Sequence, residues 1–201
     1  MKVEQNIEKS DTRQYILQKA VPLLASNGYS GVSMRDISKA VGVSSAALYH
    51  HFSDKECLYI EVMKYAFSDK ALAMTEILSM KGSPFERLEY FIKNFVSLME
   101  ADPDFRALVQ WELLAGDEAR LKLVAEEVFF APFQAITVLA EELDMDCDPH
   151  MAAVSIIGLV MFHFETAPIL RFLPGAKPEH NDPKNIAQHV TKLLRKTFLT
   201  N

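Results

Sequence analysis

Four residues, Ser45, Ala46, Tyr49 and His50, are small or polar and fall on one face of a short expected helix. Hydroxyl, phenol and imidazole groups form hydrogen bonds with the edges of nucleic-acid bases, and an alanine methyl can touch the methyl group of thymine. Carried on a rigid helix, such a set predicts a surface that enters the major groove of DNA. The pattern therefore predicts a class of partner as well as a fold.

Residues 33–52 supply the elements that would hold this face in place. Ser33 is a good N-cap with Asp36 at the third helical position, which is the spacing of a capping box. Gly42 suits the left-handed conformation that ends a helix, and Ser44 is placed to cap the next one. The segment thus predicts a helix, a three-residue turn and a second short helix.

Apolar residues in this segment fall on the opposite, inward face. Ile37 and Val41 share one side of the first helix, and Leu48 and Phe52, four residues apart, share one side of the second. Packing of these two faces favours a helix-turn-helix over two unrelated short helices.

The stretch from Thr12 to about Leu58 resembles the N-terminal part of the tetracycline-repressor (TetR) family of bacterial transcription regulators. The resemblance covers roughly a quarter of the chain. The residues that carry it are Arg13, Ile16-Leu17, Gly28-Tyr29, Gly31-Val32-Ser33, Ile37, Gly42-Val43-Ser44, Leu48-Tyr49, His51-Phe52 and Lys55-Glu56.

The resemblance implies a homodimeric repressor that binds a palindromic operator in double-stranded DNA and is released by a small-molecule effector. Together with the geometry above, it places phosphate contacts at Ser33, Arg35, Ser44, His51 and Lys55. The groove-facing contacts are those of Ser45, Ala46, Tyr49 and His50, with Tyr49 suited to either backbone or base.

Composition and patterning favour an all-α chain. The resemblance implies that it is divided into an N-terminal DNA-binding domain over 1–53 and a C-terminal ligand-binding and dimerisation domain over 54–201. Pro22 lies inside the first helix and predicts a kink at residues 18–22 or two pieces. The expected helices are 10–27 after a short polar arm, 34–41, 45–51, 54–80, 84–100, 102–116, 117–144 with a bend at Pro132, 148–167 and 183–199.

The net charge of −6 is unevenly distributed along the chain. Residues 1–65 hold 8 Lys and Arg against 7 Asp and Glu, and residues 66–201 hold 13 against 20, so the two parts carry +1 and −7. Because local charge governs phosphate contact, the acidic total does not exclude a DNA-binding N-terminal domain.

We expect a cytoplasmic protein with no signal peptide and no membrane partner, because the N-terminus is polar and the apolar run Met151–Phe164 is shorter than a bilayer span. That run is expected to be a buried helix. Cys57 and Cys147 have no metal-ligand spacing and are expected to be reduced thiols, so we expect no cofactor or metal.

The second half of the chain carries many aromatic residues, as expected of a mostly apolar small-molecule pocket. A hydrophobic or amphipathic effector would fit such a pocket, and Glu112 or Glu165, if it faced the cavity, would favour an amine. Core packing is the alternative for each residue. The expected contacts are Phe95, Phe105, Trp111, Glu112, Phe133 and His163.

The resemblance also implies a dimer interface, for which helices 148–167 and 183–199 are the candidates, with core packing as the alternative. Val154, Ile157, Met161 and Glu165 form one stripe, and Gly158 would allow another backbone to approach closely. A dimer presents two reading helices about 34–36 Å apart, or at a longer interval.

The sequence leaves two alternatives to a ligand-released repressor. One is a ligand-independent DNA-binding protein of the same fold, either a constitutive regulator or a chromosome-organising protein. The other is an enzyme, which the chain does not favour because it has no HExxH, GxSxG or phosphate-binding glycine loop.

Overall fold

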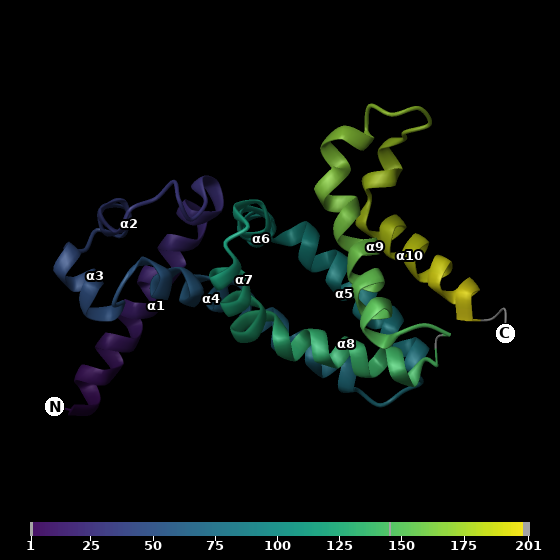
Figure 1. Cartoon of the computed structure of the whole chain (residues 1–201), viewed down its shortest axis with the longest axis horizontal. Coiled ribbons are helices and arrows are strands. Elements are labelled where there is room, and N and C mark those ends of the chain that lie inside the picture. The colour runs from purple at the N-terminus through teal and green to yellow at the C-terminus, as the bar shows by residue number, and fades with distance from the viewer. Residues whose placement is uncertain (1, 145, 199–201) are drawn as a thin grey trace. The chain divides into compact units, whose positions relative to one another are not determined.

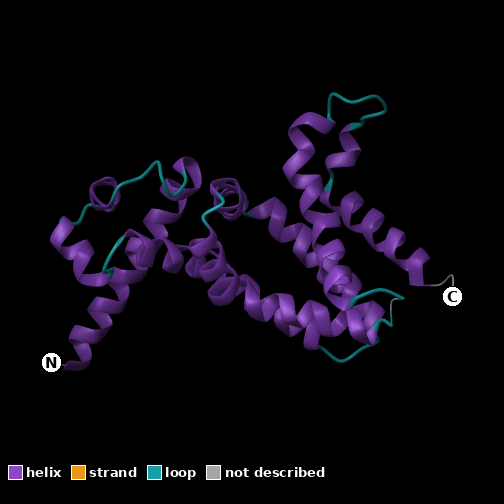
Figure 2. Cartoon of the chain, in the orientation of Figure 1, coloured by secondary structure: helices purple, strands orange, loops and turns teal. Residues whose placement is uncertain are grey.

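The computed structural model describes residues 2–144 and 146–198, and side chains over 11–144 and 146–196. Throughout these residues the chain is made of helices joined by short loops, without strands (Figure 2). The expected all-α class is therefore confirmed. The helices pack as two compact units, and the chain passes from one unit to the other three times, after residues 69, 102 and 129.

The first unit consists of the residues up to Asp69 together with Pro103–Phe129. It contains the helix-turn-helix and further helices from the middle of the chain (Figure 1). Its elements are α1 (Lys2–Asn27), α2 (Met34–Val41), α3 (Ser45–His51), the first part of α4 (Lys55–Ser79), α6 (Pro103–Ala115), α7 (Glu118–Val124) and the π-helical turn η1 (Ala125–Phe129).

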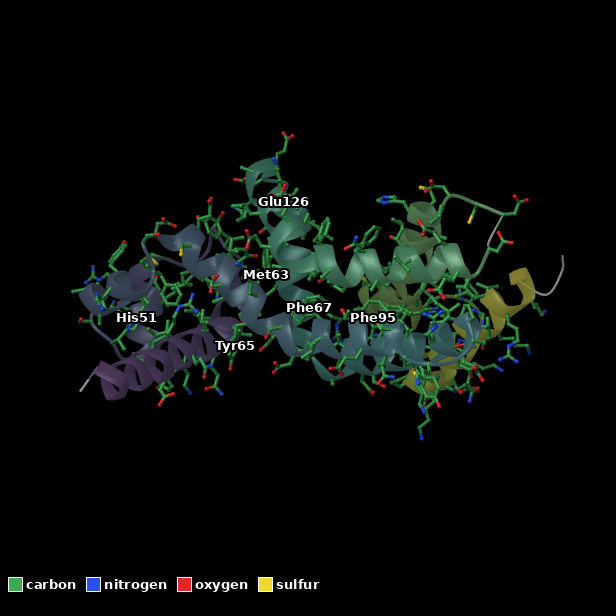
Figure 3. All side chains as sticks on the ribbon, turned by 90° about the horizontal axis from the view of Figure 1, so that it is seen from below. His51, Met63, Tyr65, Phe67, Phe95 and Glu126 are labelled. Carbon is green, nitrogen blue, oxygen red and sulfur yellow. The ribbon has the colours of Figure 1, made fainter. Side chains whose placement is uncertain are left out.

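The core of this unit is built from the inward faces of α1 to α4 and the side of α6 that packs on α1. Phe67 of α4 stacks on Phe105 of α6 with 4.9 Å between ring centroids. Figure 3 labels Met63 and Phe67, which lie one turn apart on α4 and are buried, whereas Tyr65 between them is exposed. Alternation within one helix thus separates the core face from the solvent face.

The second unit consists of Lys70–Asp102 and the residues from Phe130 onward. Helix α5 is its centre, since α8, α9 and α10 all pack against it. An ion pair between Arg87 and Glu142 joins α5 to α8. The elements are the end of α4, α5 (Pro84–Ala101), α8 (Phe130–Glu142), α9 (Pro149–Leu170), the 3-10 turn η2 (Pro178–Asn181) and α10 (Pro183–Phe198).

The expected bounds of α2 and α3 agree with the structure, but those of α1 were wrong at the start. Helix α1 begins at Lys2 rather than following a polar arm, because the Lys, Glu and Gln residues there are good helix formers. It also runs as one helix through Pro22. The carbonyl that Pro22 leaves without a donor belongs to Gln18, an exposed residue, so water can reach it.

Two other prolines also differ from expectation. Around Pro132 the expected long helix is continuous over Glu118–Glu142, but it contains the π turn η1 directly before α8. A proline lacks an N–H and its ring crowds the carbonyl four residues earlier, and a widened turn relieves that crowding. Pro168 was expected to end its helix, but α9 continues to Leu170 because a proline in the last turn removes one internal bond only.

Helix α9 is the main departure from the expected packing. The stretches Glu118–Glu142 and Pro149–Leu170 are both long and apolar enough to span a bilayer by composition, a test that core helices of soluble proteins also pass. Only 17% of the apolar window of α9 is buried within the chain, so the expectation of a buried helix was wrong. Much of its apolar surface is exposed, since only part of the helix packs on α5, α8 and α10.

The packing units do not follow the division expected from function. Helices α6 and α7 pack with the helix-turn-helix segments, while α4 contributes its first part to one unit and its end to the other. The division at residue 53 into DNA-binding and ligand-binding domains stays a prediction.

Candidate nucleic-acid interface

Local hydrogen bonds fix both ends of α2. The hydroxyl of Ser33 accepts from the backbone N–H of Asp36 at 3.1 Å, and the Asp36 carboxylate accepts from the backbone N–H of Ser33 at 3.0 Å. The hydrogen bonds from the Ser33 side chain and backbone lower the pKa of Asp36. At its other end α2 stops at Gly42, whose φ of 79° is left-handed.

The same kind of local contact starts α3. The hydroxyl of Ser44 accepts from the backbone N–H of Ala47 at 3.1 Å, as a serine N-cap does. Ser38 is buried in the turn between the helices, where its hydroxyl donates to the carbonyl of Arg35 and lies 3.3 Å from that of Ser45. These bonds hold α3 at a defined angle to α2.

Apolar anchors place α3 against the rest of the unit. Ile37 and Leu48 are fully buried, and Phe52 is 1% exposed, as the inward-face pattern predicted. The guanidinium of Arg13 lies 5.1 Å from the centroid of the Phe52 ring and forms an ion pair with Glu61 of α4. Arg13 therefore connects α1 to both α3 and α4, a role that the sequence pattern did not assign to it.

With its inward face buried, α3 presents its other face outward. Ser45, Ala46 and His50 are exposed, and the Tyr49 side chain is 52% exposed. His51, labelled in Figure 3, is half-buried and its ring meets the edge of the His50 ring at 5.6 Å. The geometry leaves the four expected groove residues accessible on one short helix, and their contact with DNA stays a prediction.

Most of the expected phosphate contacts surround this face. Ser33, Arg35 and Ser44 are exposed, while Lys55 is half-buried in the first turn of α4. Ser33, Tyr49 and Lys55 line a surface hollow of about 540 Å³, together with the loop Ser30–Val32 and the acidic residues Asp36 and Asp54. Cationic, hydroxyl and helix-N-terminal groups thus converge where a phosphate would approach a groove-bound helix.

Lys55 has a neighbour that the sequence pattern did not reveal. Its ammonium lies 4.2 Å from the centroid of the Tyr29 ring, and the Arg120 guanidinium of α7 lies at the same distance from that ring. Burial, followed by the charge of Arg120, lowers the pKa of Lys55. Tyr29 and Arg120 are 91 positions apart in the chain, so no local spacing could have indicated this contact.

The six residues expected to contact an effector divide between the two packing units. Phe105, Trp111 and Glu112 belong to α6 in the first unit, and Phe95, Phe133 and His163 belong to the second. Of the six, only His163 lines the cavity of about 600 Å³ beside η2, with Arg171, Lys177 and His189 among its other residues. Ligand contact by any of the six stays a prediction.

The α6 residues have specific partners in the protein. The indole N–H of Trp111 donates to the carbonyl of Ala25 at 2.9 Å, while its ring packs against Gly28. Both carboxylate oxygens of Glu112 lie 2.9 Å from Nε of Arg120, and both side chains are buried. Arg120 neutralises Glu112, so this carboxylate does not favour an amine ligand.

The expected contacts of the second unit lie in different surroundings. Phe95 is buried and stacks near Phe91, whereas the Phe133 ring meets His150 edge-on at 5.0 Å. His163 faces His189 at 6.1 Å, and burial, followed by the charge of His189, lowers its pKa. Glu165 is exposed on α9. Among the described residues, no group of three or more His, Cys, Asp or Glu is arranged to hold a metal ion.

Comparison with known proteins decides the family. The model of bacterial regulatory proteins of the tetR family matches residues 16–62, which span the helix-turn-helix and its α1 and α4 supports. The chain belongs to the TetR family. The resemblance noted in the sequence is thereby confirmed.

Two curated TetR-like relatives indicate how far the similarity extends. The repressor AcnR of Corynebacterium diphtheriae is 38% identical over 82 residues, which are 41% of this chain and 41% of AcnR. The nucleoid occlusion factor SlmA of a Marinomonas species is 27% identical over 122 residues, 61% of this chain and 62% of SlmA. The chain thus matches less than two thirds of either relative's length.

The TetR fold extends over nearly the whole chain. The transcriptional regulator FadR of Bacillus subtilis, solved in complex with stearoyl-CoA, aligns with a TM-score of 0.74 at 22% identity. The alignment covers 90% of this chain and 96% of FadR. An N-terminal helix-turn-helix followed by a helical C-terminal part is therefore the architecture of this TetR protein.

Proposed function

We propose that this chain is a cytoplasmic, sequence-specific DNA-binding transcriptional repressor that works as a homodimer. The observation that carries the proposal is the α2–turn–α3 segment, capped at Ser33 and Ser44 and exposing Tyr49 and His50 beside Lys55. The match to the TetR family model over residues 16–62 and the similarity to the AcnR repressor support it.

The exposed face of α9 supports the homodimer. Val154 and Phe162 are 45% and 61% exposed, and a Cβ added at Gly158 would meet nothing within 4 Å. A large apolar face of this kind marks an interaction surface. A two-fold dimer would present two α3 helices to a palindromic operator, and the two half-sites give a specificity that one short helix lacks.

A small hydrophobic or amphipathic effector is the proposed releasing signal. Similarity in fold to FadR with bound stearoyl-CoA makes a long-chain acyl-CoA the first probe to test. Effector binding would favour a head spacing that no longer matches the operator, and it can shift the equilibrium only by its differential affinity for the two states. Helix α4 is the proposed lever because it is continuous through Lys55–Ser79.

The proposal is tested by fluorescence anisotropy with DNA fragments flanking the protein's own gene, at two salt concentrations and with competitor DNA. Tyr49→Ala and Lys55→Ala are each expected to weaken binding. Losing the Lys55 phosphate contact should also make the negative slope of log K against log salt shallower by about 0.9.

Matched control variants distinguish the loss of a DNA contact from a general loss of structure. Tyr90→Ala removes a tyrosine of nearly equal exposure, 51%, on α5, and Lys122→Ala removes an exposed lysine of α7. Both controls should bind DNA as the unaltered protein does. Binding without fragment preference in a genome-wide selection, or equal losses in the controls, would overturn a sequence-specific regulator that uses α3.

The similarity to SlmA favours a second candidate, a ligand-independent DNA-binding protein that acts in chromosome organisation. Many dispersed binding sites and no response to stearoyl-CoA or other acyl-CoAs would favour it over the repressor. We also propose that the chain has no catalytic activity of its own, because its relatives are named as regulators and its sequence lacks the motifs of common hydrolases.

A further inference from the structure

The Tyr29 cluster, made of Tyr29, Lys55, Tyr59, Glu112 and Arg120, brings two cations to one aromatic ring. The ammonium of Lys55 and the guanidinium of Arg120 each lie 4.2 Å from the centroid of Tyr29. A cation within about 6 Å of a ring centroid is attracted by the ring quadrupole. The ring is thus shared between a surface lysine of α4 and a buried arginine of α7.

Arg120 is the fixed partner of the two. Its side chain is 5% exposed, its Nε lies 2.9 Å from both carboxylate oxygens of Glu112, and its NH1 lies 3.4 Å from Asp117. Although burial opposes it, the Glu112 carboxylate raises the pKa of Arg120. A guanidinium held at two points in this way has little freedom to move away from Tyr29.

Tyr29 is held from a second direction by Tyr59. The two rings meet edge to face with centroids 5.1 Å apart and planes at 76°, and Tyr59 is fully buried. Arg120 also lies 5.8 Å from the Tyr59 ring centroid. The orientation of the Tyr29 ring is therefore set by buried groups, while the ring itself is half-buried and reaches the surface.

Lys55 is the adjustable member of the cluster. It forms no ion pair with a carboxylate among the described residues, and it lines the surface hollow together with Ser33 and Tyr49. A phosphate in the hollow would be attracted by the Lys55 ammonium but repelled by the carboxylates of Asp36 and Asp54, which line the same hollow. Where the ring holds the ammonium therefore decides how well a phosphate can reach it.

We propose that Arg120 is a positioning residue for Lys55, acting through the Tyr29 ring so that the ammonium is presented to a DNA phosphate in the hollow. This inference rests on the proposed DNA-binding function. It assigns a part in DNA contact to a buried residue of α7, which lies outside the helix-turn-helix.

The main test variant removes the guanidinium without leaving a buried charge. Arg120→Met alone would strand the Glu112 carboxylate, so it is combined with Glu112→Gln. Glu112→Gln with intact Arg120 is the matched control, and Arg120→Lys is the conservative variant that keeps a cation beside Glu112. Circular dichroism and urea unfolding establish that each variant is folded.

The first readout does not depend on DNA. Protons of the Lys55 ε-methylene lie near the Tyr29 ring, so NMR should show them shifted upfield in the unaltered protein, with assignment by Lys55→Arg. Tyr29→Leu and the Glu112→Gln, Arg120→Met double variant should both lose this shift, and Arg120→Lys should partly restore it. An unchanged shift in the folded double variant overturns the inference.

The second readout is the salt dependence of binding to double-stranded DNA. Lys55→Ala should make the negative slope of log K against log salt shallower by about 0.9. The double variant should make it shallower by a similar amount. Adding Lys55→Ala to the double variant should change affinity by less than about twofold, because coupled sites are not additive. Independent effects that simply add would contradict positioning.

The two readouts distinguish failure of the inference from failure of the proposed function. If the unaltered protein binds no DNA while the NMR shift depends on Arg120, the positioning of Lys55 holds and the DNA-binding proposal fails. If DNA is bound and Lys55→Ala weakens binding, but the shift does not depend on Arg120, the DNA-binding proposal stands and the inference fails.

Discussion

At the residue scale, two glycines of the first unit have the same backbone requirement but different surroundings. Gly28 and Gly42 have φ values of 68° and 79°, both in the left-handed region that side chains rarely adopt. A Cβ at Gly28 would lie 2.9 Å from Cδ2 of Trp111, whereas one at Gly42 would meet nothing within 4 Å. A glycine is therefore required at position 28 for two reasons, its left-handed backbone conformation and the close approach of Trp111 from α6.

Alanine substitution should separate these two requirements. Gly42→Ala is expected to lower the free energy of unfolding by about 1–2 kcal/mol, the cost of a left-handed non-glycine residue. Gly28→Ala should cost more, because Trp111 must also move from its place against the α1 C-terminus. Urea unfolding of both variants measures the difference, and equal losses would show that Trp111 does not press on this site.

At the element scale, the capping of α2 combines structure with the proposed DNA contact. Ser33 with Asp36 starts α2, and Ser83 with Glu86 starts α5 through the same reciprocal pair of hydrogen bonds. The two capping boxes are chemically alike, but only the first lies beside the hollow that Lys55 lines. Ser83 is therefore a matched control for the proposed role of Ser33 in DNA binding.

Ser33→Ala and Ser83→Ala should each lower the free energy of unfolding by about 1 kcal/mol, the usual cost of losing a serine N-cap. Only Ser33→Ala should also weaken DNA binding, because it alone removes a hydroxyl and disorders amides proposed to meet a phosphate. Urea unfolding and anisotropy on the same preparations test this. A similar loss of DNA affinity in Ser83→Ala would point to stability as the common cause.

At the scale of the whole molecule, the exposed apolar face of α9 requires explanation. A surface of this kind is stable in water when another surface covers it, and the homodimer is the proposed cover. The stripe of Val154, Ile157, Met161 and Glu165 lies along this helix, with Gly158 open to a neighbouring backbone.

Phe162→Glu should convert the dimer to a monomer, because a carboxylate would lie within the apolar interface. Sedimentation velocity should show the change of mass, and anisotropy should show a loss of operator affinity. Phe130→Glu is the control, since Phe130 is 62% exposed on α8 against 61% for Phe162 on α9. A dimer that survives Phe162→Glu, or one lost equally in both variants, would place the interface elsewhere.

The sequence by itself determined the local features of this protein. Caps, glycine termini and apolar spacing act within about four residues, so the bounds of α2 and α3 and the outward position of Tyr49 and His50 could be predicted from them. The TetR resemblance is carried by the same residues. Helix propensity at the start of α1 and a proline near the end of α9 give no such sharp local signal. These two helix ends could therefore not be placed correctly.

Only the tertiary structure decided which distant groups meet. Glu112 was expected in a ligand pocket because it lies in an apolar stretch, but folding pairs it with Arg120. The contact of Arg120 with Tyr29 and the packing of Trp111 on Gly28 join residues more than 80 positions apart. Such pairings depend on how helices cross, which the periodicity of apolar residues does not encode. An apolar face also has the same sequence pattern whether a helix of its own chain or another molecule covers it.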